Sequence, residues 1–179
     1  MEHIIVNDDV RLETVKLSMA EVIFTTIDGN RGTLKKWLPF VDMTRQINDT
    51  EIFLQSVINQ PSKKRDEIYS IWFREEFAGL IGFKETDWVN RKTEIGYWLS
   101  PKMEGKGIAT SCAKKLTRFA FKKLKLNRVQ VKVAVGNVKS SAIPKRLGFQ
   151  LEGIERAGEL NQNKFFDLEI YSLLKSDLL

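Results

Sequence analysis

A glycine-bearing loop ahead of a helix is the pattern in this sequence with the clearest chemistry. Glu104, Gly105, Lys106 and Gly107 directly precede a long amphipathic segment. The first backbone N–H groups of a helix have no partners within the helix, and the helix dipole favours negative charge beside them. Because glycine has no Cβ, a phosphate can approach the main chain closely, and the lysine can add a charged contact. The loop predicts a diphosphate-binding site, although its spacing alone fits a tight turn equally well.

Two common nucleotide-binding motifs do not fit this loop. A dinucleotide fingerprint needs a third glycine within a repeated strand–helix–strand unit, and a P-loop ends in Gly-Lys followed by Ser or Thr. Neither feature occurs around Gly105 and Gly107.

The segments around the loop resemble a known family. The run Ile95–Leu99, followed by Gly105–Ala109, is similar to the acetyl-CoA loop of the GNAT acetyltransferases. Resemblance to the ribosomal-protein-alanine (RimJ/RimL) branch is carried, in chain order, by Asn30-Arg31, Leu34, Trp37-Leu38-Pro39, Asn137, Ser140, Arg146-Leu147-Gly148-Phe149, Leu151-Glu152-Gly153, Asp167 and Tyr171-Ser172-Leu173-Leu174. The resemblance implies an N-acetyltransferase with one GNAT domain over residues 1–179.

The resemblance also implies acetyl-CoA as the cosubstrate, without a metal. It places the cofactor between two splayed parallel strands, Lys92–Leu99 and Arg128–Val135, whose unpaired main-chain groups can bind pantetheine amides. A free N–H near Trp98 or Leu99 would stabilise the oxyanion as an amine attacks directly, through a tetrahedral intermediate and without an acyl-enzyme. The implied cofactor contacts are Trp98, Leu99, Glu104, Gly105, Lys106, Gly107, Ile108, Ala109, Thr110, Asn137 and Ser140.

Glu104 departs from the family pattern, which has Gln or Arg at this position. A carboxylate that pointed at a diphosphate would repel it. We expect Glu104 to face solvent instead, where an acidic residue near a helix start is favourable.

Three side chains are candidates for moving protons. Glu159 occupies the position of the general base in the Rim-type enzymes that the chain resembles, and a solvated loop carboxylate is the alternative reading. Glu94, on the predicted cofactor strand, is a second candidate base, and a cross-strand ion pair is its alternative. Ser140 matches the family's proton donor to the departing sulfur. It is also a natural N-cap, which would put Pro144 near the first turn of a helix.

The resemblance implies that the acceptor is an amine. At neutral pH roughly a tenth of peptide α-amines, with a pKa near 8, are unprotonated, against far fewer lysine amines with a pKa near 10.4. A glutamate acting through water therefore suits an N-terminal amine, and the resemblance implies a ribosomal protein as the acceptor. A polyamine or an aminoglycoside is the alternative. The candidates for the acceptor-binding wall, each with core packing as its alternative, are Trp37, Phe40, Trp72 and Tyr97.

Hydrophobic spacing and turn residues predict the elements that position these groups. The expected strands are Val10–Leu17 at a sheet edge, Ile68–Phe73, Phe77–Phe83, Lys92–Leu99, Arg128–Val135, Phe149–Arg156 and Phe165–Leu174. The expected helices are Ser18–Asp28, capped by Ser18, then Arg31–Leu38, Asp49–Asn59, Gly105–Leu124 and Ser140–Leu147. This order predicts one α/β (α+β) domain. Its central sheet is mixed and mostly antiparallel, with splayed parallel strands and helices on both faces.

Composition excludes several classes of function. A single cysteine and a single histidine, Cys112 and His3, cannot form an internal disulfide or a His-based metal site. Cys112 lies on the apolar helix face, which predicts a small buried side chain. No apolar stretch approaches the roughly 20 residues that span a bilayer, and the N-terminus lacks signal-peptide order. We therefore predict a cytoplasmic protein without a membrane partner, and the resemblance suggests a homo-oligomer of two or more copies.

The net charge of +6 suits anionic partners. Four basic residues at helical spacing could contact ribosomal RNA or an acidic protein, or could simply be solvated: Lys114, Arg118, Lys122 and Lys125. A basic nucleic-acid-binding module and a cofactor-binding protein, both without catalysis, are the alternatives outside enzymes.

Overall fold

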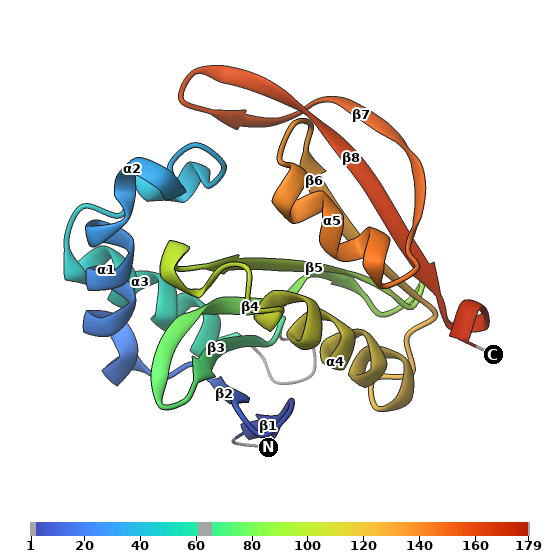
Figure 1. Cartoon of the computed structure of the whole chain (residues 1–179), viewed down its shortest axis with the longest axis horizontal. Helices are drawn as coiled ribbons and strands as arrows, with labels where there is room; N and C mark the ends of the chain where they lie inside the picture. The colour runs from blue at the N-terminus through green and yellow to red at the C-terminus, as the bar shows by residue number, and fades with distance from the viewer. Residues whose placement is uncertain (1–2, 61–65, 179) are drawn as a thin grey trace.

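The chain is built around an eight-stranded sheet (Figure 1). The computed structural model describes residues 3–60 and 66–178. The strands lie in the order β1-β2-β3-β4-β5-β6-β8-β7, and every neighbouring pair is antiparallel except the parallel pair β5 and β6. The strands are β1 (His3–Ile5), β2 (Val10–Thr14), β3 (Ile68–Phe73), β4 (Glu76–Asp87), β5 (Lys92–Leu99), β6 (Arg128–Ala134), β7 (Gln150–Asn161) and β8 (Lys164–Leu174).

The described part of the chain also contains five α-helices and four short 3-10 turns. The helices are α1 (Ala20–Gly29), α2 (Arg31–Leu34), α3 (Ile47–Ile58), α4 (Ile108–Lys122) and α5 (Val138–Arg146). The turns are η1 (Leu17–Met19), η2 (Pro39–Asp42), η3 (Pro101–Met103) and η4 (Lys175–Leu178).

The sheet opens between its two parallel strands. Within the described residues, β5 and β6 pair only through Lys92 with Arg128, Thr93 with Val129 and Glu94 with Gln130. Farther along, β5 stays paired with β4 and β6 with β8, while the two strands separate from each other. Figure 1 shows β6 and β8 turning away from β5. The facing edges of residues 95–99 and 131–134 therefore carry main-chain groups without partners in the ladder.

Helices cover both faces of the sheet. Successive residues of a strand point to opposite faces. Leu80 and Trp98 accordingly pack in a cluster with side chains of α1 and α3, whereas Ile81 and Ile95 pack in a second cluster with α4. The predicted apolar face of α4 is buried, and burial raises the pKa of Cys112 to about 12, as expected for an inert core thiol.

The element order confirms the predicted fold class. Both ends of β3 and of β5 fall where the sequence places them. The predicted edge strand at Val10 is wrong in position, because β1 pairs outside it and forms the edge. The helix predicted over Arg31–Leu38 ends at Leu34, well before Pro39.

Helix capping also differs from expectation. Ser18 does not cap α1, since it lies within η1 and α1 begins after it without a side-chain cap. A capping box forms instead at α3, between Gln46 and Asp49.

Candidate active site

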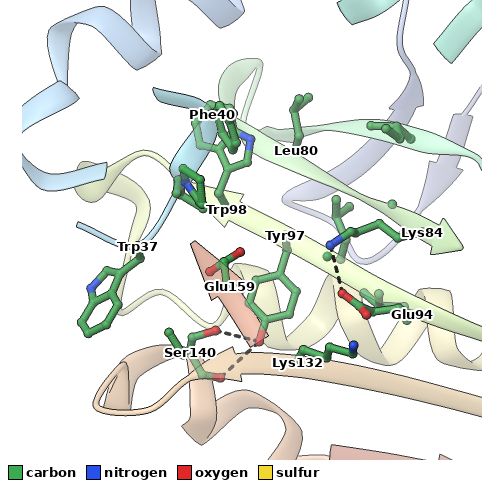
Figure 2. A pocket seen from close by; sticks show the side chains of 18 of the residues that line it. Trp37, Phe40, Leu80, Lys84, Glu94, Tyr97, Trp98, Lys132, Ser140 and Glu159 are labelled. Atoms are coloured by element: carbon green, nitrogen blue, oxygen red, sulfur yellow. Dashed lines mark hydrogen bonds and ion pairs between the residues drawn. The ribbon is translucent and has the colours of Figure 1, made fainter. Parts of the chain in front are cut away.

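A cavity of about 680 Å³ lies where β5 and β6 separate, and it extends beneath the helices on one face of the sheet. Five elements each contribute a polar side chain to it: Lys84 from β4, Glu94 from β5, Lys132 from β6, Ser140 from α5 and Glu159 from β7. Figure 2 shows the Glu159 carboxylate with Trp98 and Trp37 on one side and, on the other, Tyr97 and then the Lys84–Glu94 pair. The arrangement joins a candidate base to an apolar wall and to the opening in the sheet.

A β-bulge positions Glu159. On the hairpin of β7 and β8, Glu155 pairs with Leu168 and Glu159 pairs with Phe166, so that residues 156–158 all lie opposite Asp167. The Asp167 Oδ1 accepts the N–H of Ala157 at 2.8 Å, and Ala157 has a φ of 50°, an unusual value for a residue with a side chain. Bulges beside active sites commonly redirect a side chain. This bulge brings Glu159 to the cavity.

The surroundings of Glu159 favour its neutral form. Burial raises the pKa of this carboxyl, Lys84 lowers it, and the negative charge of Glu94 raises it further. A carboxylic acid whose pKa moves toward the working pH is better matched to accept and return a proton.

Glu94 forms the cross-strand ion pair that was its alternative reading. Its Oε1 lies 3.0 Å from the Lys84 Nζ, and its Oε2 accepts a weak hydrogen bond of 3.4 Å from Gln130. Lys84 is its register partner on β4. Both carboxylate oxygens therefore already have partners, even though Glu94 also lines the cavity.

Asn137, and not Ser140, caps α5. The Asn137 Oδ1 accepts the Ser140 N–H at 3.3 Å, so α5 begins earlier than expected and Pro144 lies in its interior. Proline has no N–H for the carbonyl four residues before it, which here is that of Ser140.

Tyr97 compensates for the missing donor. Its hydroxyl donates to the Ser140 carbonyl at 3.1 Å and accepts from the Ser140 Oγ at 3.2 Å. Burial raises the pKa of Tyr97 to about 12, so the hydroxyl keeps its proton at neutral pH. The tyrosine thus joins β5 to α5 across the opening and holds the Ser140 hydroxyl at the cavity (Figure 2).

The start of α4 has the backbone that the glycine loop predicts. Gly105 and Gly107 have φ values of 75° and 73°, in the left-handed region that favours glycine. Gly107 is the N-cap and has no side chain to satisfy the first helical N–H groups. Those of Ile108, Ala109 and Thr110 remain for water or a ligand.

Glu104 faces a cation and is about one third exposed. Its Oε2 lies 2.5 Å from the Nζ of Lys139, near the start of α5. We expected the Glu104 carboxylate to face solvent, and in the structure its negative charge is offset by the Lys139 ammonium. Lys106 turns toward the sheet, with its Nζ 5.1 Å from the Phe73 ring centroid.

The predicted site residues fall into three sets. Those that line the cavity are Trp37, Phe40, Glu94, Tyr97, Trp98, Asn137, Ser140 and Glu159. The predicted diphosphate contacts from Glu104 to Thr110, together with Leu99, lie outside its lining. Trp72 is not brought to the cavity. Its indole donates to the Ser70 Oγ at 2.9 Å, and the Arg11 guanidinium lies over its ring.

Sequence reasoning missed three contributors. Lys84 lies opposite Glu94 only in this hairpin register, and Lys139 meets Glu104 only after the fold brings α5 to the loop. The role of Asp167 depends on the bulge. The alternation of β4 and β5 across a short turn could have suggested the first pair, whereas the other two carry no local signal.

Two further properties bear on function. Across residues 3–60 and 66–178, His, Cys, Asp and Glu side chains nowhere gather in groups of three that could hold a metal ion. Among the helices of those same residues, each is too short or too polar to cross a bilayer.

Comparisons with known proteins agree with this geometry. Residues 9–150 match the family of acetyltransferase (GNAT) domains. The "Putative ribosomal N-acetyltransferase YdaF" of Bacillus subtilis (strain 168) is 35% identical over 176 residues, covering 96% of this chain and 94% of that protein. The ribosomal-protein-serine acetyltransferase of Escherichia coli (strain K12) is 25% identical over 171 residues, 96% of each chain.

Two other proteins widen the comparison. The spermidine N(1)-acetyltransferase of Escherichia coli (strain K12) is 28% identical over 127 residues, 71% of this chain and 66% of that one. The crystal structure of the microcin C7 self-immunity acetyltransferase MccE, in complex with acetyl-CoA and AMP, superposes with a TM-score of 0.89 at 29% identity over 94% of both chains.

Proposed function

Because the chain belongs to the acetyltransferase (GNAT) domain family, we propose that it moves the acetyl group of acetyl-CoA to the N-terminal α-amine of a protein, with ribosomal proteins as the acceptor class. The observation that carries the proposal is the half-buried Glu159 in a cavity that continues into the opening between β5 and β6.

Two features of this chain fit a coenzyme A thioester. The unpaired main-chain groups of residues 95–99 and 131–134 match the amides of pantetheine, which need both donors and acceptors. The free N–H groups at the start of α4 match a diphosphate. When bound, acetyl-CoA supplies the thioester whose acetyl group is transferred.

The residues of the cavity divide the remaining work. Glu159 takes a proton from the acceptor ammonium, directly or through water, and its raised pKa suits that exchange. A main-chain N–H near Trp98 or Leu99 donates to the thioester oxygen. The Ser140 hydroxyl, which donates to Tyr97 in this structure, can turn to hydrogen-bond the departing sulfur. Glu94 serves to hold Lys84 and is the less suited base.

The acceptor class rests on the relatives and on charge. Two relatives across nearly the full chain are named for ribosomal substrates. The basic residues Lys114, Arg118, Lys122 and Lys125 are exposed, on or just after α4, where they can approach ribosomal RNA. We also propose a cytoplasmic location and a homo-oligomer, which cell fractionation and light scattering test.

The test is acetyl-CoA-dependent thiol release with a panel of short peptides, spermidine and an aminoglycoside. We expect the peptides with free α-amines to react, and mass spectrometry to place the acetyl group on that amine. The Glu159→Gln variant should be at least about a hundredfold slower, whereas Glu21→Gln, at an exposed carboxylate on α1, should match the unaltered protein. Peptides without activity, beside rapid reaction of spermidine, would refute the proposal.

A polyamine acetyltransferase is the second candidate. It is favoured by the spermidine relative and by the acidic residues Glu85, Glu94 and Glu159 at the cavity. The same assay separates the two functions.

A further inference from the structure

The cavity has a second part, which lies between the sheet and the helices of its α1–α3 face. We call this part the acceptor arm. It is lined by apolar side chains from α1, the η2 segment, α3 and β4: Ile23, Ile27, Phe40, Met43, Phe53 and Leu80. Three of them belong to the buried core on this face, with Phe40 packed against it. The wall of the arm is therefore fixed by the packing of the domain.

Charge is distributed unevenly along the cavity. Glu85, Glu94 and Glu159 lie at the opening in the sheet, together with Lys84 and Lys132. Among the described lining residues, the α1–α3 side contributes one acidic group, Asp49. The Asp49 Oδ2 is occupied by the N–H groups of Arg45 and Gln46, at 2.8 and 3.0 Å, where it caps α3.

An occupant of the whole cavity must match both parts. It needs one ammonium near Glu159, because the catalytic carboxylate lies at the opening. A second ammonium in the arm would lose its hydration to an apolar wall and would find no free carboxylate there to pair with. Burial of an unpaired charge is strongly unfavourable. A polyamine, whose cationic groups are spaced along the chain, fits this pattern poorly.

The rim of the arm extends the apolar surface outward. Met43 is 69% exposed and Phe53 is 38% exposed, and both line the cavity. An apolar side chain placed there would cover them from water, which stabilises the complex in proportion to the area buried.

We propose that the acceptor arm receives an apolar side chain from the first two residues of the acceptor, so that the enzyme selects N-termini with a bulky apolar residue there. The selection rests on the proposed function of the same site. Full burial of a leucine-sized side chain corresponds to about a 10- to 100-fold gain in kcat/KM over glycine.

The test uses short peptides that differ in one residue, with Leu, Phe, Gly, Lys or Asp at the first or the second position and Ser or Ala at the other. We expect kcat/KM for Leu or Phe to exceed that for Gly by about tenfold or more, mainly through KM, and Lys to fall below Gly. Equal values of kcat/KM for Leu, Gly and Lys would refute selection by the acceptor arm and would leave the proposed function unaffected. Acetylation of spermidine without any peptide would overturn both.

A charge variant at the rim localises the effect. Met43→Glu should reduce the preference for Leu over Lys by about tenfold or more, through a higher KM for the Leu peptide and a lower KM for the Lys peptide. Ile52→Glu is the matched control, since Ile52 is an exposed apolar residue of α3 outside the cavity lining. It should leave the preference unaltered. Equal responses of the two variants would show that the apolar preference arises elsewhere.

Discussion

The contact between Tyr97 and the Ser140 carbonyl allows a prediction in which two substitutions must interact. Pro144 deprives that carbonyl of its helical donor, and the Tyr97 hydroxyl replaces it at 3.1 Å. Tyr97→Phe leaves a partly buried carbonyl unsatisfied, which we expect to lower the free energy of unfolding by about 1–2 kcal/mol. For a chain of this size, each kcal/mol lowers Tm by about 2–4 °C.

Pro144→Ala should remove most of that loss. Alanine restores an N–H at the position that reaches the Ser140 carbonyl within α5, so the helix no longer depends on the tyrosine. Urea denaturation of the two single variants and the double variant gives the coupling energy. We expect it to be about 1 kcal/mol, with Tyr97→Phe nearly neutral in the Pro144→Ala background. Additive effects, within about 0.5 kcal/mol, would show that Tyr97 does not replace the proline's missing donor.

Three other predictions concern the active site. Glu159→Gln should lower kcat at least about a hundredfold and also stabilise the protein. Because the pKa of Glu159 is raised in the folded protein, the stability that its neutral carboxyl provides is complete below the unfolded pKa of about 4.3 and is lost as pH rises through the folded pKa. Glutamine stays neutral at every pH. The gain in Tm of Glu159→Gln over the unaltered protein should therefore appear at neutral pH and vanish near pH 4. Glu104→Gln should leave the Kd for acetyl-CoA unchanged or lower it, because a carboxylate near the diphosphate site is removed and Lys139 is freed; weaker binding in calorimetry would contradict this placement. Asp167→Ala should reduce kcat, because it removes the acceptor that holds the bulge at Ala157, and should leave KM for acetyl-CoA unaffected. Asp167→Asn keeps an acceptor oxygen and should retain much of the activity. An equal loss of kcat in both variants would argue against positioning of Glu159 through that hydrogen bond.

Much of the fold could be predicted because it depends on local periodicity. The aromatic and β-branched residues of β3 and β5 fix both ends of these strands. The apolar spacing of α4 identifies its buried face in the same way. β1 escaped prediction because three residues are too few to show a period, and only its pairing with β2 makes it a strand.

The candidate site was predictable where a residue's chemistry matched a family position. Glu159, Ser140, Tyr97 and Asn137 all reach the cavity. The cap of α5 was assigned to Ser140, when the asparagine three residues earlier already supplies the acceptor oxygen. Trp72 was indistinguishable by type from the aromatic residues that do line the cavity, because strand direction alone does not reveal which way an indole turns.

The acceptor arm and the bulge could not be predicted for a different reason. The bulge requires a positive φ at Ala157, a residue that ordinarily avoids it, and a hydrogen bond from the opposite strand. Such features depend on how strands pair and how helices pack against them, which local composition does not specify.

The central claim is that the main chain at the start of α4 and at the opening between β5 and β6 binds a coenzyme A thioester. Isothermal titration of the folded protein with acetyl-CoA tests it most directly, with dephospho-CoA and pantetheine as comparison ligands. We predict saturable binding with one site per chain, and much weaker binding of pantetheine, which lacks the diphosphate. Absence of heat at millimolar acetyl-CoA, or equal affinity for pantetheine, would contradict the account.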